Sequence, residues 1–141
     1  MIERISEKDM YHQLSFYTLS HALPSFIHQH IVDAYAAQHA ADNSKTITTV
    51  FALVGLYLTL EKNYSGRQVQ RAHMKLARKR KDWPRLSPPQ NTGGFNVFDV
   101  MHALPGADRD KAILKWCSSV WDSWRESHQK IADLVHAELG I

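Results

Sequence analysis

The sequence lacks cysteine pairs, a signal peptide and a long apolar segment, which are common features of small extracellular and membrane proteins. Its only cysteine among 141 residues is Cys117, which excludes a disulfide framework within the chain and a zinc site built from cysteine pairs. Residues 1–9 are charged and lack the apolar core of a signal peptide. The most apolar stretch, residues 49–60, has about half the length that a bilayer requires. We therefore expect a cytoplasmic protein without a membrane segment.

Several catalytic and nucleotide-binding motifs are also absent. The sequence contains no GxGxxG, no glycine-rich phosphate loop ending in Gly-Lys-Ser/Thr and no GxSxG elbow. It has neither HExxH nor the Glu-x-x-His pair of di-iron bundles. The sequence therefore gives no motif evidence for a common nucleotide-binding fold, an α/β-hydrolase or one of the best-known helical metal enzymes.

What is present is ordinary globular composition, with 44% hydrophobic and 22% charged residues. Helical spacing of apolar residues predicts a first helix that begins with the capping box Ser6-Glu7-Lys8-Asp9, and a second one up to about residue 40. Further helices are expected at about 45–63, 67–81 and 108–138, with a helical turn at 97–103. A proline- and glycine-rich loop occupies about 82–94. This pattern predicts one all-α domain over 1–141, a compact antiparallel bundle of about five helices.

The expected last helix carries a heptad stripe that includes one histidine. The stripe consists of Leu114, Cys117, Trp121, Trp124, His128, Ile131 and Val135, and it predicts that Trp116 lies off the buried face. A buried imidazole without a hydrogen-bond partner or a metal costs roughly 1–3 kcal/mol. His128 is therefore either a core histidine with a satisfied hydrogen bond or part of a site.

The second helix concentrates further polar candidates. His28 and Tyr35 share one helical face, whereas His30 and Asp33 lie three residues apart on another and can pair. A carboxylate that orients a histidine is common in acid–base and metal sites. We predict a polar pocket with four catalytic candidates, which are His28, Asp33, Tyr35 and His128.

A metal site in the same pocket would use His28, Glu61 and His128. Imidazole and carboxylate ligands suit a divalent zinc, iron, manganese or nickel ion, and the sequence does not choose among them. In this hypothesis the protein acts on a small-molecule ligand.

The charge distribution supports an alternative. Residues 67–85 hold eight basic side chains against one acid, Asp82, so a segment of net charge +7 leaves −4 for the remaining chain. Arg71, Lys75 and Arg78 fall near one face of the expected helix 67–81, and Trp83 follows it. Such a helix is either solvated surface or an anion-binding site, at which cations contact phosphates and the tryptophan stacks on a base.

Several segments resemble an uncharacterised bacterial domain family, a domain of unknown function. They are residues 28–39 (HQHIVDAYAAQH), residues 53–61, Pro88-Pro89, residues 96–100 (NVFDV), and residues 116–128 with the run SVWDSW. The resemblance covers about residues 11–131 and implies that His28, Asp33, Tyr35, His39, Glu61 and His128 occupy motif positions. It implies no activity.

Two functions therefore remain open. One is a small helical protein with a His/Asp/Tyr pocket, with or without a metal, that acts on a small molecule. The other is a non-enzymatic binding module that contacts nucleic acid or another anionic partner through the basic helix. The sequence decides neither whether the protein is an enzyme nor its oligomeric state.

Overall fold

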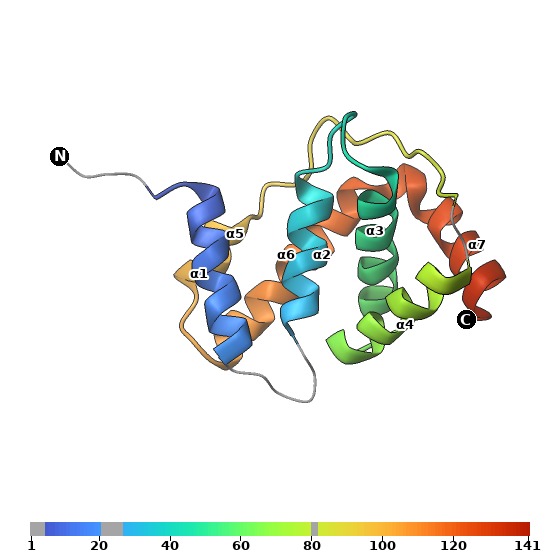
Figure 1. Cartoon of the computed structure of the whole chain (residues 1–141). Helices are drawn as coiled ribbons and strands as arrows, with labels where there is room; N and C mark the ends of the chain where they lie inside the picture. The colour runs from blue at the N-terminus through green and yellow to red at the C-terminus, as the bar shows by residue number, and fades with distance from the viewer. Residues whose placement is uncertain (1–4, 21–26, 80–81) are drawn as a thin grey trace.

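The computed structural model describes residues 5–20, 27–79 and 82–141 (Figure 1). All regular structure in these ranges is helical, with no β-strand, as predicted. It holds seven α-helices rather than five, together with one short 3-10 helix. They are α1 (Glu7–Ser20), α2 (His28–Gln38), α3 (Thr46–Glu61), α4 (Gly66–Lys79), α5 (Val97–His102), α6 (Ala107–Ser123), η1 (Arg125–Ser127) and α7 (His128–Leu139). Residues 80–81, the predicted end of the basic helix, lie outside the described ranges.

The apolar helix α3 occupies the centre of the fold. It packs against α2, α4, α6 and α7, while α1 and α5 pack together on the far side of α2 (Figure 1). In the same view α4 crosses obliquely below the end of α3 rather than running alongside it. No helix of the described residues is long and apolar enough to cross a membrane.

Local capping explains where two helices begin. Ser6 accepts a hydrogen bond from the backbone N–H of Asp9, as the capping motif predicts for α1. Asn96 accepts from the N–H of Phe98, and Asp99 accepts from the N–H of Asn96, which completes a capping box for α5. The expected helical turn is therefore a short helix with its own start signal.

The predicted single helix at 108–138 is two helices. The N–H of Trp124 bonds to the carbonyl of Trp121, and the chain then tightens into η1 before α7 begins at His128. The Trp121 carbonyl also accepts from Nε2 of His128 at 2.7 Å. In an unbroken helix His128 would lie two turns, roughly 10 Å, beyond Trp121, so this bond forms only with the break and stabilises it.

The buried face of α6 includes Trp116 in place of Leu114. Leu114 is 44% exposed, whereas Trp116 is fully buried and donates its indole N–H to Oε1 of Gln38 at 2.9 Å. Residues on both sides of the predicted stripe are apolar, so packing against α2 selects the face. The prediction for these two residues is therefore wrong.

Residues 82–96 form a strap across one end of the molecule, without helix (Figure 1). Nε2 of Gln38 donates to the carbonyl of Phe95 at 2.8 Å, and Arg85 donates to the carbonyl of Asp42 at 3.0 Å. Leu86 is buried. The strap is thus fixed to α2 and to the connection between α2 and α3.

Candidate functional site

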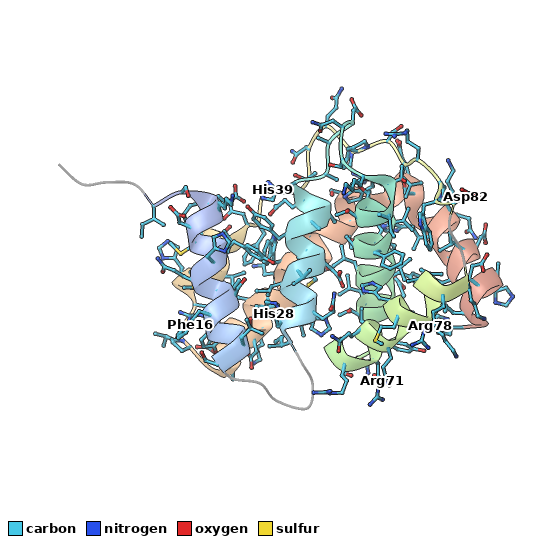
Figure 2. The ribbon with its side chains drawn as sticks, viewed as in Figure 1. Phe16, His28, His39, Arg71, Arg78 and Asp82 are labelled. Carbon is cyan, nitrogen blue, oxygen red and sulfur yellow. The ribbon has the colours of Figure 1, made fainter. Side chains whose placement is uncertain are left out.

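His28 lies at the start of α2 and contacts α1. Its Nδ1 is in a hydrogen bond with Oγ1 of Thr18 at 2.9 Å, and the same hydroxyl lies 3.0 Å from the Ser15 carbonyl. Burial lowers the pKa of His28. His39, at the opposite end of α2 (Figure 2), is 3.0 Å from Oε1 of Glu7. Both histidines therefore attach α2 to α1.

Asp33 is buried between α2 and α3. Its Oδ1 accepts from Nε2 of Gln29 at 3.1 Å, while Oδ2 has no hydrogen-bond partner among the described residues. Burial raises its pKa well above the ordinary value. Asp33 does not pair with His30, whose Nδ1 is 3.1 Å from Oγ1 of Thr59. Burial therefore favours the protonated form of this carboxyl group.

Tyr35 belongs to an aromatic contact between α1 and α2. Its ring stacks on that of Tyr11 with centroids 3.9 Å apart and planes 9° apart, and His39 lies 4.3 Å away. The ring therefore holds α1 in place.

His128 and Glu61 meet at one indole. The His128 ring stacks on Trp121 with centroids 3.8 Å apart and planes 7° apart. Oε1 of Glu61 accepts from the indole N–H of Trp121 at 3.3 Å. His128, which is half-buried, therefore has its own hydrogen bond, to the Trp121 carbonyl, and its own packing partner in Trp121.

The four residues of the predicted polar pocket take part in different contacts in the structure. His28, Asp33, Tyr35 and His128 contact separate partners, and none of them lines either of the two cavities described below. The residues that the structure describes contain no group of three or more His, Cys, Asp or Glu side chains able to hold a metal ion. The predicted metal ligands His28, Glu61 and His128 are thus not brought together.

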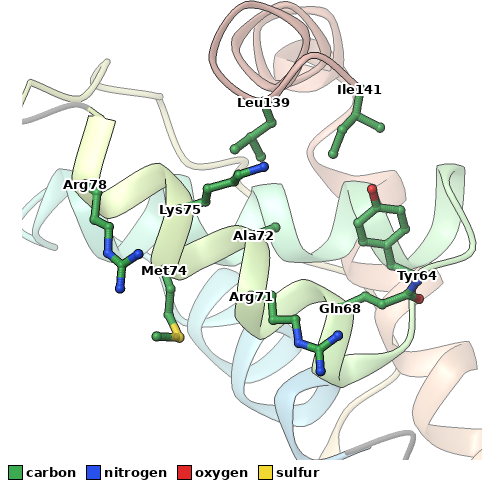
Figure 3. Close-up of a pocket in the computed structure, with 9 residues that line it drawn as sticks. All are labelled: Tyr64, Gln68, Arg71, Ala72, Met74, Lys75, Arg78, Leu139 and Ile141. Carbon is green, nitrogen blue, oxygen red and sulfur yellow. The ribbon is translucent and has the colours of Figure 1, made fainter.

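The larger cavity, of about 480 Å³, lies instead between α4 and the end of α7 (Figure 3). We call it the basic groove. Its nine lining residues come from three segments. They are Tyr64, then Gln68, Arg71, Ala72, Met74, Lys75 and Arg78 of α4, then Leu139 and Ile141.

The basic groove is lined by both cationic and apolar side chains. Arg71, Lys75 and Arg78 are exposed, and none is in an ion pair or hydrogen bond with another described residue. The lining contains no acid. In Figure 3, Lys75 extends towards Leu139, whereas Arg71 and Arg78 extend from α4 away from Leu139 and Ile141. The sequence-predicted cations therefore share a concave surface with an apolar wall.

Trp83 is not part of the groove lining. It is half-buried and meets the Phe51 ring edge-on, with centroids 5.0 Å apart and planes 89° apart. The predicted stacking platform for a base is instead packed against α3.

A second cavity of about 410 Å³ lies between the strap and the junction of α6 and α7. Arg125 and Glu126 both line it, so the charges of this cavity are mixed. It provides no excess of charge that would select a ligand.

A family model matches residues 8–125 of the chain and describes a family of unknown function, DUF5946. The chain belongs to this family. Searches of curated proteins and of solved structures found no match. Residues 8–125 include the whole of α4, whereas Leu139 and Ile141 lie beyond the matched range. The predicted resemblance to a domain of unknown function is confirmed, and it gives no activity.

Sequence reasoning found the cations of the groove but not its apolar wall. Tyr64 lies far in the sequence from Leu139 and Ile141, and only the packing of α7 beside α4 brings it close to them. The close approach of Gly55 to Asp33 has a clearer signal in the sequence than the apolar wall has, because a glycine inside a helix stands out. A glycine inside a helix costs about 1 kcal/mol relative to alanine and usually has a packing reason.

Proposed function

We propose that the protein is a non-enzymatic binding module that holds an anionic ligand in the basic groove between α4 and α7. The observation that carries the proposal is the set of three exposed cations, Arg71, Lys75 and Arg78, which have no partner among the described residues and line one cavity without an acid. Unpaired cations on a concave surface focus a positive potential, which attracts and orients anions.

The spacing of these cations suits one shared anionic group. Side chains three and four residues apart on a helix have Cβ atoms roughly 5–6 Å apart. Lys75 is four residues from Arg71 and three from Arg78, so the ammonium group lies between two guanidinium groups along the helix. Guanidinium groups bind carboxylate and phosphate oxygens in pairs, which adds orientation to attraction.

The catalytic hypothesis has less support, because His28, Asp33, Tyr35 and His128 each have a structural partner of their own. We retain the inference of a cytoplasmic protein, which the buried free thiol of Cys117 supports, because reduced cysteines are usual in that compartment.

The test is a titration of isotopically labelled protein with anions. NMR chemical shifts identify the residues that respond, and their dependence on anion concentration gives the affinity. The panel contains inorganic phosphate, polyglutamate, single-stranded DNA and alkyl phosphates. We expect at least one anion to shift the amides of residues 68–78 and 139–141. For single-stranded DNA, neutralisation of three charges predicts a slope of about −2 in log affinity against log salt, at about −0.7 per charge.

A matched pair of triple variants isolates the site. Arg71→Glu/Lys75→Glu/Arg78→Glu should abolish binding, whereas Lys111→Glu/Arg125→Glu/Lys130→Glu makes the same change in net charge elsewhere on the surface. Equal loss in both variants, or no binding by any anion in the panel, would refute the proposed function.

A further inference from the structure

We infer that the ligand of the basic groove is a single-chain amphiphile with a phosphate monoester head. This inference rests on the proposed function, and it adds the chemical class of the ligand. Three features of the groove support it: its apolar wall, the number of its cations and the position of Trp83 outside it.

The apolar wall, formed by Leu139 and Ile141, favours a ligand that has a hydrocarbon part. Leu139 and Ile141 are half-buried and face α4, and Ala72 of α4 is 7% exposed. A purely ionic ligand would leave this wall in contact with water, whereas an alkyl chain would cover it and gain the free energy of apolar burial. The cavity volume of about 480 Å³ falls within the range of roughly 300–1,000 Å³ typical of small-molecule sites.

The cations favour a phosphate over a carboxylate. A phosphate monoester carries about −1.5 to −2 charges at pH 7 and three acceptor oxygens, whereas a carboxylate carries one charge and two oxygens. Arg71, Lys75 and Arg78 offer three positive charges with no acid in the lining. A phosphate monoester, with up to two negative charges, therefore balances these three positive charges more closely than a carboxylate with one.

Nucleic acid fits the groove less well. Single-stranded binding sites combine a positive path with aromatic rings on which successive bases stack. The groove has one aromatic ring, that of Tyr64, because Trp83 packs edge-on against Phe51 outside the lining. The observations thus favour one anionic head with an apolar tail over a chain of phosphates.

The experiment compares four probes on the full chain by isothermal titration calorimetry. They are dodecyl phosphate and dodecanoate, both below their micelle concentrations, inorganic phosphate, and a 20-nucleotide single-stranded DNA. We expect dodecyl phosphate to bind at least tenfold more tightly than each of the other three. Arg71→Gln/Arg78→Gln should weaken dodecyl phosphate at least tenfold, with Arg125→Gln/Lys130→Gln as the matched control.

Variants of the wall test the tail separately. Leu139→Ser/Ile141→Ser should weaken dodecyl phosphate without changing the weaker affinity for butyl phosphate, and a thermal melt establishes that each variant is folded. If the double serine variant is unstable, the affinity ratio of dodecyl to butyl phosphate in the wild type gives the same information. A ratio near one would overturn the amphiphile assignment.

The outcomes separate the two proposals. Equal binding of dodecanoate and dodecyl phosphate overturns the phosphate head. Tighter binding of DNA than of dodecyl phosphate, dependent on Arg71 and Arg78, overturns the amphiphile but leaves the proposed function standing. Absence of any binding that depends on these arginines overturns both.

Discussion

The carboxyl group of Asp33 in α2 occupies the space that a side chain at Gly55 of α3 would need. A Cβ atom built on Gly55 would overlap Oδ2 of Asp33. Both residues are buried at the contact between α2 and α3, and Oδ2 lacks a hydrogen-bond partner among the described residues. The missing side chain of one helix thus accommodates a polar side chain of the other.

Gly55→Ala should destabilise the protein. Alanine is the better helix former by about 1 kcal/mol, but overpacking of a filled interior costs typically 1–3 kcal/mol. Because the overlap is with a buried carboxyl group, we expect the packing cost to prevail. The measurement is the free energy of unfolding from urea denaturation.

The control for this prediction is Asp33→Ala. In the Asp33→Ala background the space is open, so Gly55→Ala should be neutral or stabilising, and a double-mutant cycle gives the coupling between the two sites. If Gly55→Ala stabilises the wild type as much as it stabilises the Asp33→Ala variant, the close approach has no energetic consequence.

Asp33→Asn should remove one component of the pH dependence of stability. Burial raises the pKa of Asp33 in the folded state well above the ordinary 3.8, so the folded protein keeps a proton that the unfolded chain loses. The contribution to stability is therefore present below about pH 4 and is lost as pH rises towards the folded pKa. Asparagine accepts the same bond from Gln29 and does not ionise.

The measurement is the difference in unfolding free energy between Asp33→Asn and wild type, from pH 4 to pH 8. We expect the variant to gain relative stability as pH rises. Contributions from histidines are common to both proteins and cancel in the difference. A difference that is independent of pH would show that the Asp33 carboxyl is ionised in the fold.

His30→Asn should reduce destabilisation by acid. Burial lowers the pKa of His30 from 6.5 to about 4, so the unfolded chain binds a proton that the folded protein does not. Stability is therefore lost as pH falls from about 6.5 to about 4, by about 3 kcal/mol for a shift of this size. Asparagine can keep the hydrogen bond to Thr59 without titrating. Urea unfolding of His30→Asn and of the wild type at several pH values in this window measures the effect.

His128→Ala should reduce stability and leave anion binding intact. The variant loses the stacking on Trp121 and the hydrogen bond to the Trp121 carbonyl, together worth about 1–3 kcal/mol. His136→Ala, at an exposed position of the same helix, serves as the control. A loss of ligand affinity in a stable His128→Ala protein would instead place this histidine in a binding site.

Much of the fold follows from local sequence signals, because caps and helical periodicity act within a few residues. Ser6 and Asn96 begin helices through hydrogen bonds to nearby backbone groups, and the apolar run of α3 requires a buried position. The break at Trp124 was not predictable, because the heptad spacing continues through it and the bond that stabilises the break comes from His128. The choice between Leu114 and Trp116 depended on Gln38, 78 residues from Trp116.

For the candidate site, too, some features could be predicted from local sequence and others depend on tertiary packing. The three cations follow from the helical spacing of α4, which is a local property. The apolar wall depends on where α7 lies, and that position follows from the break between α6 and α7. The histidines are of a residue type typical of a site, but each partner, such as Thr18 for His28, comes from another helix.

Gln38 has a consequence for the order of folding events. Its one side-chain amide joins α2 to the strap at Phe95 and to α6 at Trp116, partners that are 57 and 78 residues away along the chain. These bonds form only after α2 and α6 have docked, because the long loops between them must close first. We therefore expect the attachment of the strap to form late in folding. The indole N–H of Trp116, which donates to Gln38, should exchange with solvent only when α2 and α6 separate.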